Sequence, residues 1–474
     1  HNPPSIEKLE EAKNRLKYEE LFSFMFKINY LKLENKKKDS GIKKAIDDSK
    51  INQFIKTLPF ELTSDQKTAV NDILNDLRGE GKMNRLLQGD VGSGKTIVAF
   101  LAIYANYLAG YQSALMVPTE ILAVQHFNNM NNLLKNTGLR ISLLTGSTPK
   151  KEKEKILFSL AQNDIDVVIG THSLIQEEVE YFNLGLVITD EQHRFGVNQR
   201  ANLQNKGKRP DTLYMSATPI PRTYALTIFG DMDVSTIKTR PKGRKKIHTV
   251  LKSEQEMKEV LAMMYEELKA DHQIYVIAPL IEESETSDLT NVNELRDKLT
   301  VAFGSKYKIG LVHGKMATVI KDKVMDDFLL NKCQILISTT VIEVGVDVPN
   351  ATMMVIFDAN RFGLSTLHQL RGRVGRNDLQ SQCILISNHD TERLHIMEKT
   401  SDGFEISEED FKLRGHGDLF GTKQSGDMAF KIADIKNDYS ILLKAKEDSY
   451  NYLLKKAEEE KLLKQKIIDS IIHS

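Results

Sequence analysis

The chain has 474 residues, a length typical of roughly two to four domains. Lysine plus arginine and aspartate plus glutamate each number 65, so the net charge is zero and a nucleic acid would have to be held by local patches. Two cysteines are too few for a disulfide framework or a zinc site, which favours a reducing, cytoplasmic setting. Because no apolar run reaches the ~20 residues of a membrane span, we expect no membrane association.

The chain begins with a pattern of apolar residues three or four positions apart, which predicts a helix over residues 5–34. Residues 35–49 are rich in lysine and poor in apolar side chains, so we expect an exposed connector there. Together these features predict a helical link segment over residues 1–57.

Short apolar runs alternate with amphipathic stretches over residues 58–245. This alternation predicts a first α/β lobe with a parallel sheet and crossover helices. The candidate strands are residues 113–117, 141–144, 167–169, 186–189 and 212–215.

A charged stretch with proline and glycine, residues 239–248, reads as a linker to a second α/β lobe over residues 246–400. Residues 401–474 follow as a separate segment. Its last part, from about Asp438, predicts one long polar helix that either packs on the second lobe or binds a partner. The candidate strands of the second lobe are residues 273–277, 308–312, 334–337, 353–357 and 382–386.

The strongest chemical signal is GDVGSGKT at residues 89–96, between an apolar pair and a helical stretch. Its glycines allow backbone N–H groups to surround phosphates at a helix N-terminus, Lys95 reaches the β- and γ-phosphates, and Thr96 offers a hydroxyl to Mg²⁺. The alternative is a chance glycine-rich turn. The predicted nucleotide-binding residues here are Gly89, Asp90, Gly92, Ser93, Gly94, Lys95 and Thr96.

A pair of carboxylates, Asp190 and Glu191, ends the apolar run that starts at residue 186. Behind a phosphate-binding loop, Asp190 is suited to hold Mg²⁺ and Glu191 to take a proton from attacking water. Elsewhere such a pair is usually a solvated turn. For His193, core packing and a coupling role are equally open.

The segment from Thr63 to Gln66 opens the helix that precedes the phosphate-binding strand. Thr63 and Gln66 have the spacing of a capping box. Gln66 is also a candidate for contact with adenine, with Phe60 nearby, and the two interpretations are compatible.

In the second lobe, HQLRGRVGR at residues 368–376 offers Arg373 and Arg376 to the γ-phosphate from across a cleft, where they would stabilise transition-state charge. The alternative is a basic solvated turn. We also place Gln369 at the nucleotide. Residues 338–347 combine hydroxyls, a carboxylate and a glycine after a strand, so Gly345 and Asp347 are further candidates.

Several hydroxyl-rich segments follow candidate strands and suit contact with a sugar-phosphate backbone, which needs no base reading. Individually each is an ordinary helix cap or turn, but three in one lobe favour a nucleic-acid groove. The residues predicted to contact DNA or to couple it to the nucleotide are Thr119, Thr145, Thr171, His172, Ser216, Thr218 and Thr339.

The order of these motifs, with VHGKM at residues 312–316, resembles the core of a superfamily-2 helicase from about residue 60 to 377. Two further stretches, ITDEQHRFGVNQR at residues 188–200 and RGHGDLFGTKQSG at residues 414–426, resemble the RecG family of DNA helicases. The resemblance implies two RecA-like lobes, ATP and Mg²⁺ as cofactors, and forks and Holliday junctions as DNA partners. It also implies a translocation motif, a helical hairpin and loop, with Arg414 and Gln424 as its working residues.

Other functions stay open at this stage. Transcription–repair coupling factors share the translocation element. Their acidic motif usually reads Asp-Glu-Glu-Gln, whereas in this chain Gln192 and His193 follow Glu191. His416 and Asp418 depart from the Pro and Glu common in the RecG family. An RNA helicase and an ATP-gated DNA-binding module are the remaining rivals. No barrel-like set of strands precedes the link, so we expect a monomeric motor without the family's wedge domain.

Overall fold

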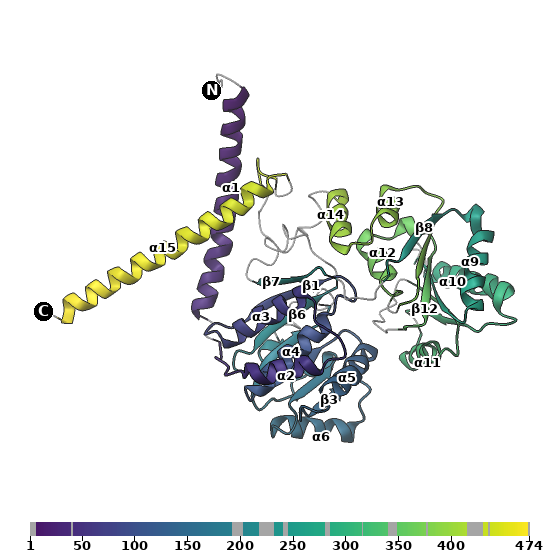
Figure 1. Ribbon diagram of the computed structural model, residues 1–474, viewed down its shortest axis with the longest axis horizontal. Coiled ribbons are helices and arrows are strands. Elements are labelled where there is room, and N and C mark those ends of the chain that lie inside the picture. Colours follow the sequence, from purple (N-terminus) through teal and green to yellow (C-terminus); the bar gives the residue numbers. More distant parts are fainter. Residues whose placement is uncertain are drawn as a thin grey trace.

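The computed structural model describes most of the chain as two α/β lobes and a pair of long helices (Figure 1). The described residues are 6–38, 41–191, 202–217, 232–239, 245–279, 285–314, 316–339, 348–375, 378–414, 430–434 and 437–472.

The first lobe is built on a seven-stranded parallel sheet in the order β3-β4-β2-β5-β6-β1-β7. All five strands predicted from apolar runs are present. Buried residues of α3 and α4 pack with alternate strand residues into one core. The elements are β1 (Asn84–Gly89), β2 (Gln112–Met116), β3 (Ile141–Leu144), β4 (Val167–Gly170), β5 (Leu184–Thr189), β6 (Asp211–Ser216), β7 (Asp233–Ile237), α3 (Ser64–Arg78), α4 (Lys95–Leu108), α5 (Glu120–Leu134), α6 (Lys150–Ala161) and the 3₁₀ turn η1 (His172–Ile175).

The second lobe has a six-stranded parallel sheet in the order β10-β11-β9-β12-β13-β8, with helices on both faces (Figure 1). Its five predicted strands are also present. The elements are β8 (His248–Lys252), β9 (Gln273–Ala278), β10 (Ile309–Val312), β11 (Ile335–Thr339), β12 (Ala351–Ile356), β13 (Gln382–Ile386), α9 (Met257–Lys269), α10 (Glu285–Phe303), α11 (Thr318–Leu329), α12 (Leu364–Arg371), α13 (Glu392–Lys399) and α14 (Gly403–Arg414). The predicted fold class, two parallel-sheet lobes with helical flanking parts, is confirmed.

Besides β1, which only the apolar pair before the phosphate-binding motif indicated, two strands, β7 and β8, were not among the predicted runs. Both lie at sheet edges, and their sequences, DVSTI and HTVLK, mix polar and apolar residues because one side of each strand is only partly buried. The predicted linker over residues 239–248 therefore ends inside the second sheet, at His248.

The predicted exposed connector is wrong at Lys44. This side chain is fully buried, and its Nζ donates to the Asp211 carboxylate at 2.6 Å and to the Gly185 carbonyl at 2.7 Å. Helix α2 (Asp48–Thr57) follows and buries Ile51 and Phe54 in the core of the first lobe. Residues 41–57 thus pack as part of that lobe rather than as a separate link.

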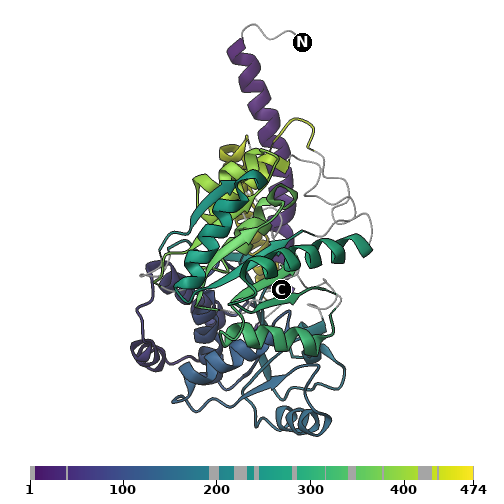
Figure 2. The same ribbon diagram turned by 90° about the vertical axis from the view of Figure 1, so that its right-hand side faces the viewer.

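The two ends of the described chain form a separate helical pair (Figure 1). Helix α1 (Ile6–Lys38) packs Leu21, Phe24 and Met25 against Leu442 and Ala445 of α15 (Tyr439–Ile472). The expectation that the tail helix packs on the second lobe is therefore wrong. In both views the amino-terminal half of α1 extends beyond the lobes (Figures 1 and 2).

None of the helices among the described residues carries an 18-residue stretch apolar enough to span a bilayer.

Candidate nucleotide site between two lobes

The phosphate-binding loop follows β1 and leads directly into α4. Gly92 and Gly94 have φ angles of 70° and 85°, a left-handed conformation that glycine adopts without a steric penalty. Gly94 is the N-cap of α4 and no side chain caps the helix there, so its first N–H groups face the loop. This is the anion-binding geometry that the sequence predicts.

Lys95 lies against its own loop. Its Nζ donates to the carbonyls of Gly89 at 2.8 Å and Asp90 at 2.9 Å. A hydroxyl beside it, Ser93 Oγ, is buried without a hydrogen-bond partner among the described residues. A cation, a hydroxyl and a helix N-terminus in one loop form a donor set that fits a triphosphate with its metal. Thr96, the predicted metal-binding hydroxyl, is the second residue of α4.

Gln66 makes the predicted capping box. Its Oε1 accepts from the Thr63 N–H at 2.9 Å, and the Thr63 hydroxyl accepts from the Gln66 N–H at 3.3 Å. Its Nε2 donates to the carbonyl of Ser93 at 2.8 Å, so α3 supports the phosphate-binding loop directly. Contact of Gln66 with adenine stays a prediction.

Asp190 and Glu191 follow β5 at the same edge of the sheet. Asp190 Oδ1 accepts from the Glu191 N–H at 2.9 Å, and Oδ2 lies 3.2 Å from Nε2 of His126. Burial alone would raise the pKa of Asp190, but the His126 hydrogen bond and the charges of His126 and Lys95 lower it on balance. Asp190 is therefore held as a carboxylate, the form that binds a divalent cation.

Glu191 has a φ of 51°, in the left-handed region that a non-glycine residue rarely adopts. Such strain is concentrated at functional sites. His126, on α5, was missed by the sequence reasoning because it lies 64 residues from Asp190 and no motif contains both. The one feature of the sequence that could have indicated His126 is its place in an amphipathic helix that begins just after a strand.

The second lobe reaches the phosphate-binding loop through the carboxyl end of α12. A Cβ added at Gly372 would lie 2.8 Å from Cβ of Val91, so glycine allows the two backbones to meet. Arg373 is the next residue and is partly exposed. Gln369 lies on α12, one turn earlier, and is also partly exposed.

Arg371, which the sequence reasoning passed over, is structural. Its Nη1 donates to the carbonyls of Met397 at 2.6 Å and Thr400 at 2.9 Å, and it is 2% exposed. Of the three arginines in the motif, the structure describes two, and only Arg373 has a partly exposed side chain.

The hydroxyl segments of the first lobe lie after strand ends, as expected. Thr119 caps α5, where its hydroxyl accepts from the Leu122 N–H at 3.4 Å. The Glu120 carboxylate accepts from the Ser147 N–H at 3.1 Å and from the Ser147 hydroxyl at 2.5 Å. These two bonds hold the segment that contains Thr119 beside the segment that contains Thr145. Thr145 is buried beside Ser147, with 3.0 Å between their hydroxyl oxygens. The capping and turn interpretations therefore apply here, and contact with DNA stays a prediction.

The remaining coupling residues are placed as follows. Thr171 precedes the 3₁₀ turn that His172 opens, and His172 is exposed. Ser216 ends β6 and Thr339 ends β11, both buried. Arg414 is the last residue of α14. Outside the described residues lie His193, Thr218, Gly345, Asp347, Arg376 and Gln424.

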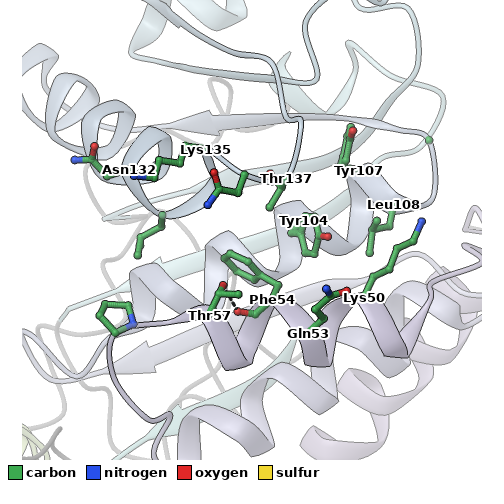
Figure 3. A pocket seen from close by; sticks show the side chains of 14 residues that line it. Lys50, Gln53, Phe54, Thr57, Tyr104, Tyr107, Leu108, Asn132, Lys135 and Thr137 are labelled. Carbon is green, nitrogen blue, oxygen red and sulfur yellow. Dashed lines mark hydrogen bonds between the residues drawn. The ribbon is translucent and has the colours of Figure 1, made fainter.

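A cavity of about 830 Å³ lies elsewhere on the first lobe, between α2, the carboxyl end of α4 and the end of α5 (Figure 3). Phe54 and Tyr104 line it, with Lys50 and Lys135 at its rim. Because it adjoins the end of α4 opposite Lys95, it is not part of the nucleotide site.

Three family models match the chain: DEAD/DEAH box helicase over residues 63–226, helicase conserved C-terminal domain over residues 255–378, and ATP-dependent DNA helicase RecG, domain 3, C-terminal, over residues 400–470. The last of these covers all of α14 and most of α15.

Curated relatives agree with these models. The ATP-dependent DNA helicase RecG of Bacillus subtilis is 50% identical over 455 residues, which cover 95% of this chain and 67% of the relative. The Streptococcus pneumoniae protein of the same name is 51% identical over 450 residues, covering 94% of this chain and 67% of the relative.

Among solved structures, RecG bound to a three-way DNA junction has a TM-score of 0.75 and 46% identity, covering 93% of this chain. The chain spans 58% of that structure's length. A yeast Dbp5 structure bound to RNA, 19% identical with a TM-score of 0.56, shares the fold alone. With half of its residues identical to the curated RecG proteins and the domain specific to them matched, the chain belongs to the RecG family of ATP-dependent DNA helicases.

Proposed function

We propose that this chain is an ATP- and Mg²⁺-dependent motor that translocates on duplex DNA and acts in fork reversal and Holliday-junction branch migration. The observation that carries the proposal is the meeting of the two lobes at the phosphate-binding loop, where Gly372, the C-cap of α12, packs on Val91. In a member of the RecG family, this contact supports a role for Arg373, the next residue, at a bound triphosphate.

The roles of the residues follow from their chemistry. Lys95 would leave its two loop carbonyls for the β- and γ-phosphates, and Thr96 with Asp190 would hold Mg²⁺. The metal supplies charge neutralisation on the phosphates when it is bound. Glu191 would orient and deprotonate the attacking water, and Arg373 with Arg376 would stabilise charge on the γ-phosphate.

The DNA track would run along the strand ends that carry Thr119, Thr145 and Thr171. Two of these segments are held together by Glu120 and Ser147. Further support comes from the junction-bound RecG structure, to which this chain is similar over 93% of its length. We place the protein in the cytoplasm as a monomer, the setting that its two buried, unpaired cysteines favour.

The experiment compares Glu191→Gln with Glu177→Gln, an exposed glutamate of the same lobe. We expect the first change to lower the ATPase kcat by about 10²–10⁴-fold while ATP still binds, because it removes the general base and leaves the loop intact. Glu177→Gln should leave the rate unchanged. An unchanged rate in Glu191→Gln would favour an ATP-gated DNA-binding module instead.

The nucleic acid is tested by ATP hydrolysis with linear duplex, single strand, fork and RNA in parallel. We expect stimulation by duplex and forked DNA. Stimulation mainly by single-stranded RNA would overturn the proposal and favour an RNA helicase.

A further inference from the structure

One side chain of the second lobe, His368, lies between the phosphate-binding loop and the start of α14. Its Nε2 is 2.5 Å from Oδ1 of Asp90, and its Nδ1 is 3.2 Å from Nη2 of Arg371. All three side chains are buried. We refer to Asp90, His368 and Arg371 as the relay.

The hydrogen-bond roles of the two ring nitrogens of His368 follow from their neighbours. A guanidinium group can only donate hydrogen bonds, so Nδ1 must accept from Arg371. The ring proton is therefore on Nε2, which donates to the Asp90 carboxylate. Arg371 thus sets the tautomer that makes His368 a donor to the first lobe.

The far end of the relay holds the helical hairpin formed by α13 and α14. Arg371 Nη1 donates to Met397 O and Thr400 O, at the end of α13. On α14, a Cβ added at Gly403 would lie 2.7 Å from His368 Nε2 and 3.0 Å from Asp90 Oδ1. The second helix of the hairpin, α14, therefore begins in direct contact with the loop that binds phosphate.

The near end of the relay responds to the nucleotide site. The carbonyl of Asp90 accepts from Lys95 Nζ at 2.9 Å, and its carboxylate accepts from the Val91 N–H at 2.7 Å and from His368. If Lys95 turns to a phosphate, that carbonyl loses the lysine and keeps the hydrogen bond that it accepts from the Ser93 N–H at 3.1 Å. The main chain of Asp90 thus contacts Lys95, and the side chain of Asp90 contacts the second lobe.

We propose that the relay transmits the state of the phosphate-binding loop to the hairpin, with His368 as a positioning residue rather than a catalytic one. The proposal rests on the motor function above. ATP would affect the hairpin through Asp90 and His368, and neither of these two residues needs to contact the phosphates.

The test uses the whole chain with His368→Ala, which removes the donor, and His368→Gln, whose amide can still donate to Asp90. His395→Ala, an exposed histidine of α13, is the matched control. We expect His368→Ala to keep its ATPase rate without DNA within about twofold and to lose about tenfold in stimulation by linear duplex, the effect of one charge-assisted hydrogen bond. His368→Gln should recover most of that loss.

A second readout does not depend on hydrolysis. Hydrogen exchange of residues 403–414 is measured with and without a non-hydrolysable ATP analogue and Mg²⁺. We expect the analogue to change this exchange in the parent chain and in His395→Ala, and to leave it unchanged in His368→Ala. If the analogue changes exchange equally in His368→Ala, the relay is refuted.

Gly403→Ala tests the same contact from the hairpin, with Gly81→Ala as the control because a Cβ there meets no atom within 4 Å. Duplex stimulation should fall in the first and persist in the second. Normal stimulation in both His368→Ala and Gly403→Ala would refute the relay while the motor stands. Absence of duplex stimulation in the parent chain would instead refute the motor, and the relay with it.

Discussion

Asp190 and His126 form a pair that local sequence could not indicate. The acidic motif at residues 190–191 predicts Asp190 as a metal ligand, but its hydrogen-bond partner comes from α5, the helix that follows the neighbouring strand β2. Nδ1 of His126 has no partner among the described residues, so the ring is oriented by Asp190 and by packing near Phe100. Partners of metal ligands usually set their orientation and basicity.

We expect His126→Ala to raise the Mg²⁺ concentration for half-maximal ATPase by roughly 10–100-fold, the range for such partners. His126 lowers the pKa of Asp190, so removing it lets burial raise that pKa. The acid limb of the pH–rate profile should then move to higher pH. His395→Ala should change neither quantity, and an unchanged Mg²⁺ requirement in His126→Ala would show that Asp190 needs no support from α5.

At the scale of elements, one buried polar contact fixes a segment that the sequence presents as exposed. Lys44 ties the connector after α1 to β6, with its side chain fully buried and that of Asp211 3% exposed. Burial lowers the pKa of Lys44 and raises that of Asp211, and their mutual attraction opposes both shifts. A lysine in a polar stretch normally predicts exposure, and only the backbone path brings this one beside a carboxylate.

Lys44→Met should lower the free energy of unfolding by roughly 3–5 kcal/mol, because Asp211 is left as an uncompensated buried charge. The neighbouring exposed lysine provides the control, and Lys43→Met should cost under about 0.5 kcal/mol. Urea denaturation followed by circular dichroism measures both. Adding Asp211→Asn to Lys44→Met should recover part of the loss, and no recovery would contradict the ion-pair explanation.

Helix α1 also holds the segment that follows residue 429. The Glu20 carboxylate accepts from the N–H groups of Lys431 at 2.7 Å, Ile432 at 3.1 Å and Ala433 at 2.8 Å. Burial alone would raise the pKa of Glu20, but these three donors lower it below the usual value of 4.5. The contact is therefore complete above pH ~5 and is lost as the pH falls through the lowered pKa.

We expect Glu20→Gln to speed hydrogen exchange of residues 431–433 at pH 7, because a neutral amide accepts these N–H groups less strongly. In the parent chain the protection factor of the same amides should fall as the pH drops from ~5 through the lowered pKa of Glu20. Glu19→Gln, on the exposed side of α1, is the control, since Glu19 pairs only with Arg15 at 3.1 Å among the described residues. Equal exchange in the two variants would show that the carboxylate does not hold this segment.

At the scale of the whole molecule, the lobes meet at the nucleotide site while α1 and α15 form their own pair. Ile121 of α5 packs against the core of the second lobe, and Lys238 lies 5.4 Å from the ring centroid of Phe404 on α14. These contacts, with the relay, join the phosphate-binding loop, the predicted DNA-contact edge and the hairpin. We therefore expect movement of one lobe against the other to change the position of the hairpin.

The contacts predicted for the strand ends are to the sugar-phosphate backbone, which linear duplex also offers, so we expect this chain to discriminate little between linear duplex and a three-way junction. Linear duplex should stimulate its ATPase, and its affinity for a three-way junction should exceed that for duplex by less than about tenfold. Competition binding with the two DNAs measures this ratio. Tight, selective junction binding would show that these 474 residues contain the junction-reading surface.

The sequence alone determined the central strands and the phosphate-binding loop, because buried parallel strands require continuous apolar runs and a phosphate cradle requires glycines at set positions. The sequence also indicated the acidic motif at Asp190, because the carboxylates of this motif are adjacent in the chain. The tertiary structure decided which groups meet across long separations: His126 with Asp190, Lys44 with Asp211, α1 with α15, and His368 with Asp90. Each of these contacts depends on one or two side chains whose local sequence carries no pattern, so only the folded backbone brings them together.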